Sequence, residues 1–74
     1  MLKLGKYKHY KGGDVEVIAL AHHSETLEEL VVYKTLYDNR TFGKGSIWVR
    51  PLKMFEENVL INGEEMPRFK YVGK

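Results

Sequence analysis

The feature that most constrains the fold is the stretch of mainly β-branched, aromatic and leucine residues at 30–37, which reads Leu-Val-Val-Tyr-Lys-Thr-Leu-Tyr. Most of these residues are β-branched or aromatic, and such residues favour a pleated strand. Residues 15–21 form a second run of this kind. Residues 5–10 alternate lysines with Tyr7 and His9, which is the period of a strand with one face in water. The chain is therefore expected to be mainly β.

Short elements complete this pattern. Residues 11–14 contain paired glycines and predict a tight turn, so the two N-terminal strands should form a hairpin. Residues 38–46, which begin with Asp-Asn and contain two glycines, are predicted to be a loop, and residues 47–50 and 68–72 are predicted to be further short strands. Pro51 ends the first of these strands, and the spacing of Leu52, Phe55 and Val59 after it predicts a short helix over residues 51–58. Asn62-Gly63 is a strong turn signal, so residues 60–67 form either a small hairpin or an irregular excursion.

Five short strands and one helix predict a small, strongly bent antiparallel sheet, or a partly open barrel of the SH3-like kind. Closure is favoured because it removes exposed strand edges. A flatter α+β arrangement, with the helix packed on one face of the sheet, is the alternative.

The size of the chain sets its organisation. With 74 residues, it is expected to form a single domain over residues 1–74. A domain this small needs large core side chains, and five Tyr, three Phe and one Trp supply them. The chain has no cysteine, which excludes disulfides and thiolate metal sites, and no apolar run approaches the length of a membrane span. A soluble protein of the cytoplasm, with no membrane partner, is therefore expected.

Charge is unevenly distributed along the chain. The net charge is only +2, but residues 1–11 and 66–74 carry lysines and an arginine without any acid. If the two ends pair as neighbouring strands, one face of the domain would be basic, and weak binding of single-stranded nucleic acid would follow. The simpler interpretation is that these lysines are solvated and protect strand edges from aggregation.

The polar stretch between the two long strands, residues 21–29, concentrates groups that could carry chemistry. His22, His23 and Glu25 are weak candidates for a metal site, although adjacent residues of a strand point to opposite faces. Ser24 next to these histidines is a weak candidate nucleophile. The structural explanation is that the hydroxyls bond nearby backbone, while one histidine donates to backbone carbonyls and the other is solvated.

A binding pocket is the favoured alternative to an enzyme. The aromatic side chains of Tyr7, Tyr33, Tyr37 and Trp48 would form its walls, and Arg50 and Arg68 would present planar donors to an anion. We therefore predict a non-catalytic binding or adaptor module for a small anionic ligand or peptide, without a cofactor. A metal-dependent or His/Glu-assisted enzyme is the competing class, and the chain is expected to be a monomer or a homodimer. The predicted site residues are His23, Ser24, Glu25, Thr26, Tyr33, Trp48, Arg50 and Arg68.

The order of several short motifs resembles one known family. The motifs are His9-Tyr10-Lys11-Gly12, His23 to Glu28, Val31-Val32-Tyr33, Leu36-Tyr37, Trp48 to Pro51, Met54-Phe55 and Arg68-Phe69. Together they are similar to the bacterial DUF1653 family, and the resemblance runs from Gly5 to Phe69. It implies a stand-alone small bacterial domain, and it implies no activity, because the family is one of unknown function.

Overall fold

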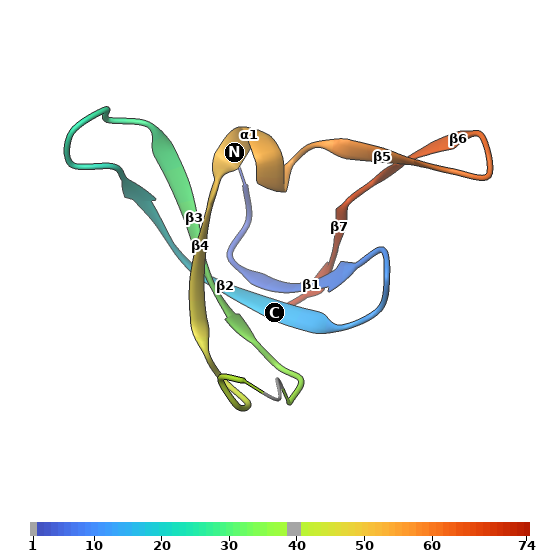
Figure 1. The fold of residues 1–74 in the computed structure, drawn as a ribbon, viewed down its shortest axis with the longest axis horizontal. Helices are drawn as coiled ribbons and strands as arrows, with labels where there is room; N and C mark the ends of the chain where they lie inside the picture. Colours follow the sequence, from blue (N-terminus) through green and yellow to red (C-terminus); the bar gives the residue numbers. More distant parts are fainter. Residues whose placement is uncertain (1, 39–40) are drawn as a thin grey trace.

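The computed structural model describes residues 2–38 and 41–74, and it shows a mainly β protein with one short helix (Figure 1). The prediction of a mainly β chain is confirmed. The elements, in chain order, are β1 (Gly5–His9), β2 (Asp14–His22), β3 (Glu29–Thr35), β4 (Ile47–Pro51), α1 (Leu52–Phe55), β5 (Asn58–Ile61), β6 (Glu64–Pro67) and β7 (Phe69–Gly73).

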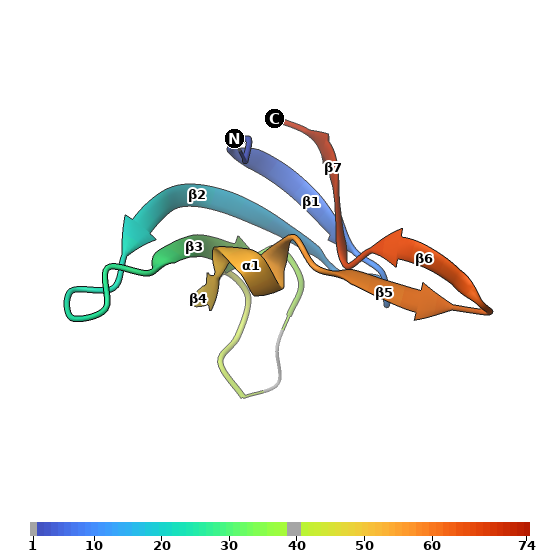
Figure 2. The same ribbon diagram turned by 90° about the horizontal axis from the view of Figure 1, so that it is seen from above.

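Five strands form one antiparallel sheet in the order β4-β3-β2-β1-β7, and β5 and β6 form a separate two-stranded sheet. The large sheet is strongly curved (Figure 2). Register shifts lie between Lys6 and Tyr7 in the β1–β7 pair and between Val17 and Ala19 in the β2–β3 pair. Irregularities of this kind bend and twist a strand. The edge strands β4 and β7 do not pair, so the predicted bent sheet is confirmed and the sheet does not close into a barrel.

The core lies on one face of the curved sheet, which we call the concave face. Cross-strand register places Tyr7 opposite Val15, and Val17 opposite Tyr33, so their side chains share this face. Phe55 of α1 covers them, and its ring stacks on that of Phe69 with centroids 4.2 Å apart. The buried apolar residues are Tyr7, Val15, Val17, Val31, Tyr33, Phe55 and Phe69.

The helix is shorter than predicted. It spans Leu52–Phe55, and the amide of Glu56 donates to the carbonyl of Leu52 at its end. Val59, which fitted the helical spacing, lies in β5 opposite Met66 instead. The prediction of a helix over 51–58 is therefore wrong at its C-terminal end, and Pro51, predicted as its first residue, is the last residue of β4. Among the residues that the structure describes, no helix is long and apolar enough to span a membrane.

The predicted turns are confirmed where the structure describes them. Asn62 and Gly63 connect β5 to β6 with φ of 52° and 82°, which is the left-handed conformation that a two-residue hairpin turn requires. The paired glycines after β1 also join β1 to β2 as a hairpin. The central strand ends at Thr35, two residues earlier than predicted. The loop predicted after it joins β3 to β4, and residues 39 and 40 lie outside the described residues.

Candidate functional site

The structure places the eight predicted site residues in two different regions. His23, Ser24, Glu25 and Thr26 lie in the exposed loop between β2 and β3. The other four residues lie on or next to β3, β4 and β7. Tyr33, Trp48 and Arg50 line one cavity, and Arg68 lies just before β7. Thr26 lines a different cavity from the one lined by Tyr33, Trp48 and Arg50, so the predicted site residues do not form one site.

In the loop, backbone hydrogen bonds account for much of the polar chemistry. The Nδ1 atom of His23 accepts from the amides of Glu25 and Thr26, at 3.1 and 3.3 Å. The hydroxyl of Thr26 accepts from the amide of Glu28 at 3.2 Å. His23 therefore accepts hydrogen bonds from backbone amides, which corrects the expectation that a histidine here donates to carbonyls. In the neutral ring the proton is then on Nε2.

The first hairpin uses the same arrangement. The Nδ1 atom of His9 accepts from the amide of Lys11 at 3.1 Å, and the His9 carbonyl accepts from the amide of Gly12 at 2.8 Å. In the second hairpin the His23 carbonyl accepts from the amide of Leu27 at 2.8 Å. Each histidine thus satisfies amides that a turn would otherwise leave without a protein acceptor. This repeated geometry supports a structural role for the loop between β2 and β3, residues 23–28, which we call the His23 loop.

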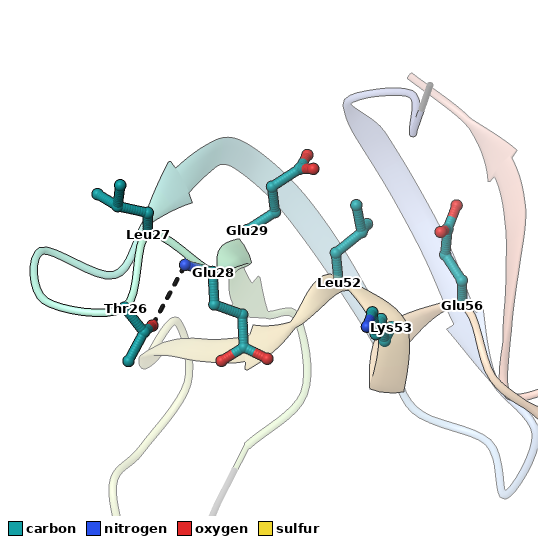
Figure 3. Close-up of a pocket in the computed structure, with 7 residues that line it drawn as sticks. All are labelled: Thr26, Leu27, Glu28, Glu29, Leu52, Lys53 and Glu56. Atoms are coloured by element: carbon teal, nitrogen blue, oxygen red, sulfur yellow. Dashed lines mark hydrogen bonds between the residues drawn. The ribbon is translucent and has the colours of Figure 1, made fainter.

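A cavity of about 640 Å³ lies between this loop and α1 (Figure 3). The side chains of Glu28 and Glu29 point away from each other, as expected for successive residues entering a strand (Figure 3). The acidic groups therefore do not converge on one point. The lining residues are Thr26, Leu27, Glu28, Glu29, Leu52, Lys53 and Glu56.

The metal candidates receive no geometric support. Within residues 2–38 and 41–74, no group of three or more His, Asp or Glu side chains lies where it could hold a metal ion. His22, His23 and Glu25 therefore do not form such a group.

A second cavity, of about 240 Å³, opens on the concave face beside the core. Alternation along β3 directs Tyr33 and Thr35 to this face, and Tyr37 follows the end of the strand. On β4, Trp48 lies opposite Tyr33 in the register, and Arg50 lies opposite the buried Val31. These five side chains, Tyr33, Thr35, Tyr37, Trp48 and Arg50, line what we call the concave cavity.

A hydroxyl network fixes the wall of the concave cavity. The indole Nε1 of Trp48 donates to the hydroxyl of Ser46 at 2.8 Å, and that hydroxyl is 3.0 Å from the hydroxyl of Thr35. Thr35 is only 3% exposed, so its hydroxyl needs this partner. Sequence reasoning missed Thr35 and Ser46 as site residues, although the alternation along β3 was a signal for Thr35.

Arg50 stands at the border between the concave cavity and the core. Its guanidinium carbon is 5.7 Å from the centre of the Phe69 ring. Among the residues that the structure describes, no carboxylate forms an ion pair with Arg50. Arg68 differs, because its Nη2 atom donates to Glu57 at 3.2 Å. Of the two arginines that the structure describes, Arg50 is therefore the one whose guanidinium is left for a ligand.

His9 lies in a region of positive potential near Arg50 and Arg68. Its ring lies 4.8 Å from that of Phe69. Burial lowers the pKa of His9 below its ordinary value of 6.5, and the positive charges of Arg50, Arg68 and Lys11 lower it further. The cations around His9 thus disfavour another positive charge there, and one of them, Arg50, lines the concave cavity. The same potential favours an anion.

Comparison with known proteins places this geometry in context. Residues 5–71 match the model of DUF1653, described as a protein of unknown function. Among solved structures, the chain is similar to the crystal structure of a DUF1653 protein from Bordetella bronchiseptica, with 36% sequence identity and a TM-score of 0.86. That similarity covers 97% of this chain and 88% of the other. A search of curated proteins found no match.

Proposed function

Since the chain belongs to DUF1653, a family of unknown function, we propose its function from the concave cavity: it is a non-catalytic module that binds a small anionic ligand with a planar or apolar body. The observation that carries this proposal is the position of Arg50, which lines an aromatic cavity and lacks a carboxylate partner among the described residues. The bacterial relative supports a bacterial origin, and a cytoplasmic location stays a prediction.

The guanidinium of Arg50 suits anion recognition. It is planar and always charged, and it matches the two oxygens of a carboxylate or phosphate with paired donors. Its contact with the Phe69 ring restricts its motion without using a carboxylate, so less entropy is lost when a ligand binds.

The rest of the concave cavity suits the body of the ligand. Tyr33, Tyr37 and Trp48 supply aromatic surface. The Trp48 indole N–H is already bonded to Ser46, so its ring offers a fixed apolar wall. Drug-sized ligands occupy pockets of about 300–1,000 Å³. The volume of about 240 Å³ therefore favours a smaller ligand, such as an aryl carboxylate or aryl phosphate.

The test is a titration of the isotope-labelled chain, followed by amide chemical shifts. Benzoate is compared with the uncharged benzamide, which has nearly the same shape. The proposal expects saturable shifts at Tyr33, Thr35 and Trp48 with benzoate and much smaller shifts with benzamide.

Two variants make this titration specific. Arg50→Met should abolish the benzoate shifts, while Lys53→Met, on α1 and outside the concave cavity, should leave them unchanged. Equal responses to benzoate and benzamide, or shifts confined to residues 23–28, would contradict the proposal.

A further inference from the structure

A second surface of the protein carries an accumulation of positive charge that the concave cavity does not use. Strands β1 and β7, near the two ends of the chain, pair with each other. Because side chains alternate between faces, Lys6, Lys8 and Lys70 point away from the buried Tyr7 and Phe69. These three lysines and Lys11, in the adjoining turn, are all exposed, and we call the four residues the lysine face.

The register brings like charges together on this face. Lys8 lies directly opposite Lys70 in the β1–β7 pair, an arrangement that destabilises a sheet. Glu16 lies opposite Lys6, but its carboxylate is bound to Lys34 at 3.5 Å.

Asp14 is the strand neighbour of Lys8 on the other side. Within the described part of the chain, however, no member of the lysine face forms an ion pair. The charge of this face is therefore left for an external anion.

An apolar groove begins at the like-charge pair. Lys8 and Lys70 line a cavity of about 170 Å³, together with His9, Tyr10, Ile61, Met66 and Pro67. The last three residues come from the β5–β6 hairpin, which projects beside the start of β7 (Figures 1 and 2). The ring of Tyr10 lies 4.6 Å from the ring of His9, and the Nζ atom of Lys11 lies 5.7 Å from the centre of the Tyr10 ring. An aromatic group thus stands next to three lysines, Lys8, Lys11 and Lys70.

We infer that the lysine face and this groove bind the backbone of single-stranded nucleic acid. The lysines contact successive phosphates, and Tyr10 offers its ring to an unpaired base. Interleaved cations and aromatic rings are the features by which proteins hold single strands without reading sequence. Outer residues two positions apart on one strand, such as Lys6 and Lys8, lie about 6.8 Å apart. That separation is close to the separation of phosphates in an extended strand.

The charge and the groove together favour a single strand over a lipid surface. A membrane would face a flat basic patch, whereas here Lys8 and Lys70 stand at the rim of a recess that also contains an aromatic ring. This inference does not rest on the proposed function, because no residue of the lysine face lines the concave cavity.

Fluorescence anisotropy with labelled U12 and dT12 tests the inference at 50 and 200 mM salt. The test variant is the double substitution Lys8→Gln and Lys70→Gln, and its control is Lys53→Gln, an exposed lysine on α1. A second variant, Tyr10→Leu, removes the stacking ring but no charge. The amide spectrum of each variant shows that it is folded.

Four phosphate contacts predict a slope of log K against log salt of about −2.8, and therefore a fall in affinity of roughly 50-fold between the two salt concentrations. The double variant should reduce the slope to about −1.4, because two contacts are lost. Tyr10→Leu should weaken binding by roughly 5- to 150-fold with little change in slope, since base stacking is insensitive to salt. Lys53→Gln should bind as the wild-type chain does.

Three results would overturn the inference. The first is no binding of either oligonucleotide at 50 mM salt. The second is an equal loss in the double variant and in Lys53→Gln, which would indicate attraction by net charge alone. The third is binding to vesicles containing anionic lipid, lost in the double variant, without binding to the oligonucleotides. Loss of benzoate binding in Arg50→Met with retained oligonucleotide binding would separate this surface from the concave cavity.

Discussion

The guanidinium of Arg50 lies over the ring of Phe69, with its central carbon 5.7 Å from the ring centre, and the same ring stacks on Phe55. An aromatic ring holds this guanidinium, and its charge stays uncompensated by the described residues. The core of this domain therefore also positions the group that we propose for anion binding.

The histidine near this ring predicts a pH dependence of stability. Burial and the charges of Arg50, Arg68 and Lys11 lower the pKa of His9 in the folded chain below 6.5. The unfolded chain then takes up a proton first as pH falls. The stability that His9 contributes is thus fully present above about pH 6.5 and is lost as pH falls through the lower folded pKa.

Thermal unfolding between pH 8 and pH 5 measures this effect. His9→Asn removes the titration and keeps a short side chain that can accept from the amide of Lys11. Its unfolding temperature should fall less between pH 7 and pH 5 than that of the wild-type chain. The exposed His22 is the control, and His22→Asn should follow the wild-type curve. Parallel curves for His9→Asn and the wild-type chain would refute this role.

The pairing of Lys8 with Lys70 predicts that reversing one of the two charges stabilises the sheet. Lys70→Glu replaces a repulsive cross-strand pair with an attractive one. The free energy of unfolding in urea should rise by about 0.2–1 kcal/mol at low salt. At 1 M salt the gain should mostly vanish, because exposed charges are screened. A loss of stability at low salt would show that the two lysines do not repel each other in the folded chain.

The backbone conformation of Leu27 predicts that a glycine at this position stabilises the chain. Its φ is 64°, in the left-handed region that a leucine rarely adopts, and its side chain is 70% exposed. Leu27→Gly should raise the free energy of unfolding by about 0.5–1 kcal/mol, since relief of strain exceeds the small loss of burial.

Leu60 is the matched control, because it is equally exposed but lies within β5. Leu60→Gly should lower stability, as glycine weakens a strand interior. If both substitutions destabilise the chain by the same amount, Leu27 is not strained.

The sequence predicted the fold where the signal was local. Alternation and β-branched runs located the strands, and Asn62-Gly63 located a hairpin turn. The helix was predicted too long because Val59 fits a helical stripe and a strand equally well. Closure into a barrel depends on whether β4 meets β7, and no local pattern encodes that contact.

The site was predicted only in part, because a local sequence pattern does not show which distant segments meet. Tyr33, Trp48 and Arg50 were expected to lie together, and they line one cavity. Their separation from the His23 loop follows from the length of β3 and β4, along which the two regions lie at opposite ends. Thr35 and Ser46 were missed because a threonine or a serine has no distinctive pattern in the sequence. Their role becomes visible only from the hydrogen bonds that link Thr35, Ser46 and the indole of Trp48.

The measurement that tests the central claim most directly is the affinity of phenyl phosphate for the wild-type chain, Arg50→Lys and Arg50→Met, by calorimetry. Hydrogen bonds to charged groups are worth about 1.5–3 kcal/mol, so Arg50→Met should bind roughly 10- to 150-fold more weakly. Arg50→Lys should be intermediate, since it keeps the charge but loses the paired donors. Lys53→Met, which leaves the concave cavity intact, should match the wild-type chain. Equal affinity of the wild-type chain and Arg50→Met would contradict the account, because the anion would then bind elsewhere.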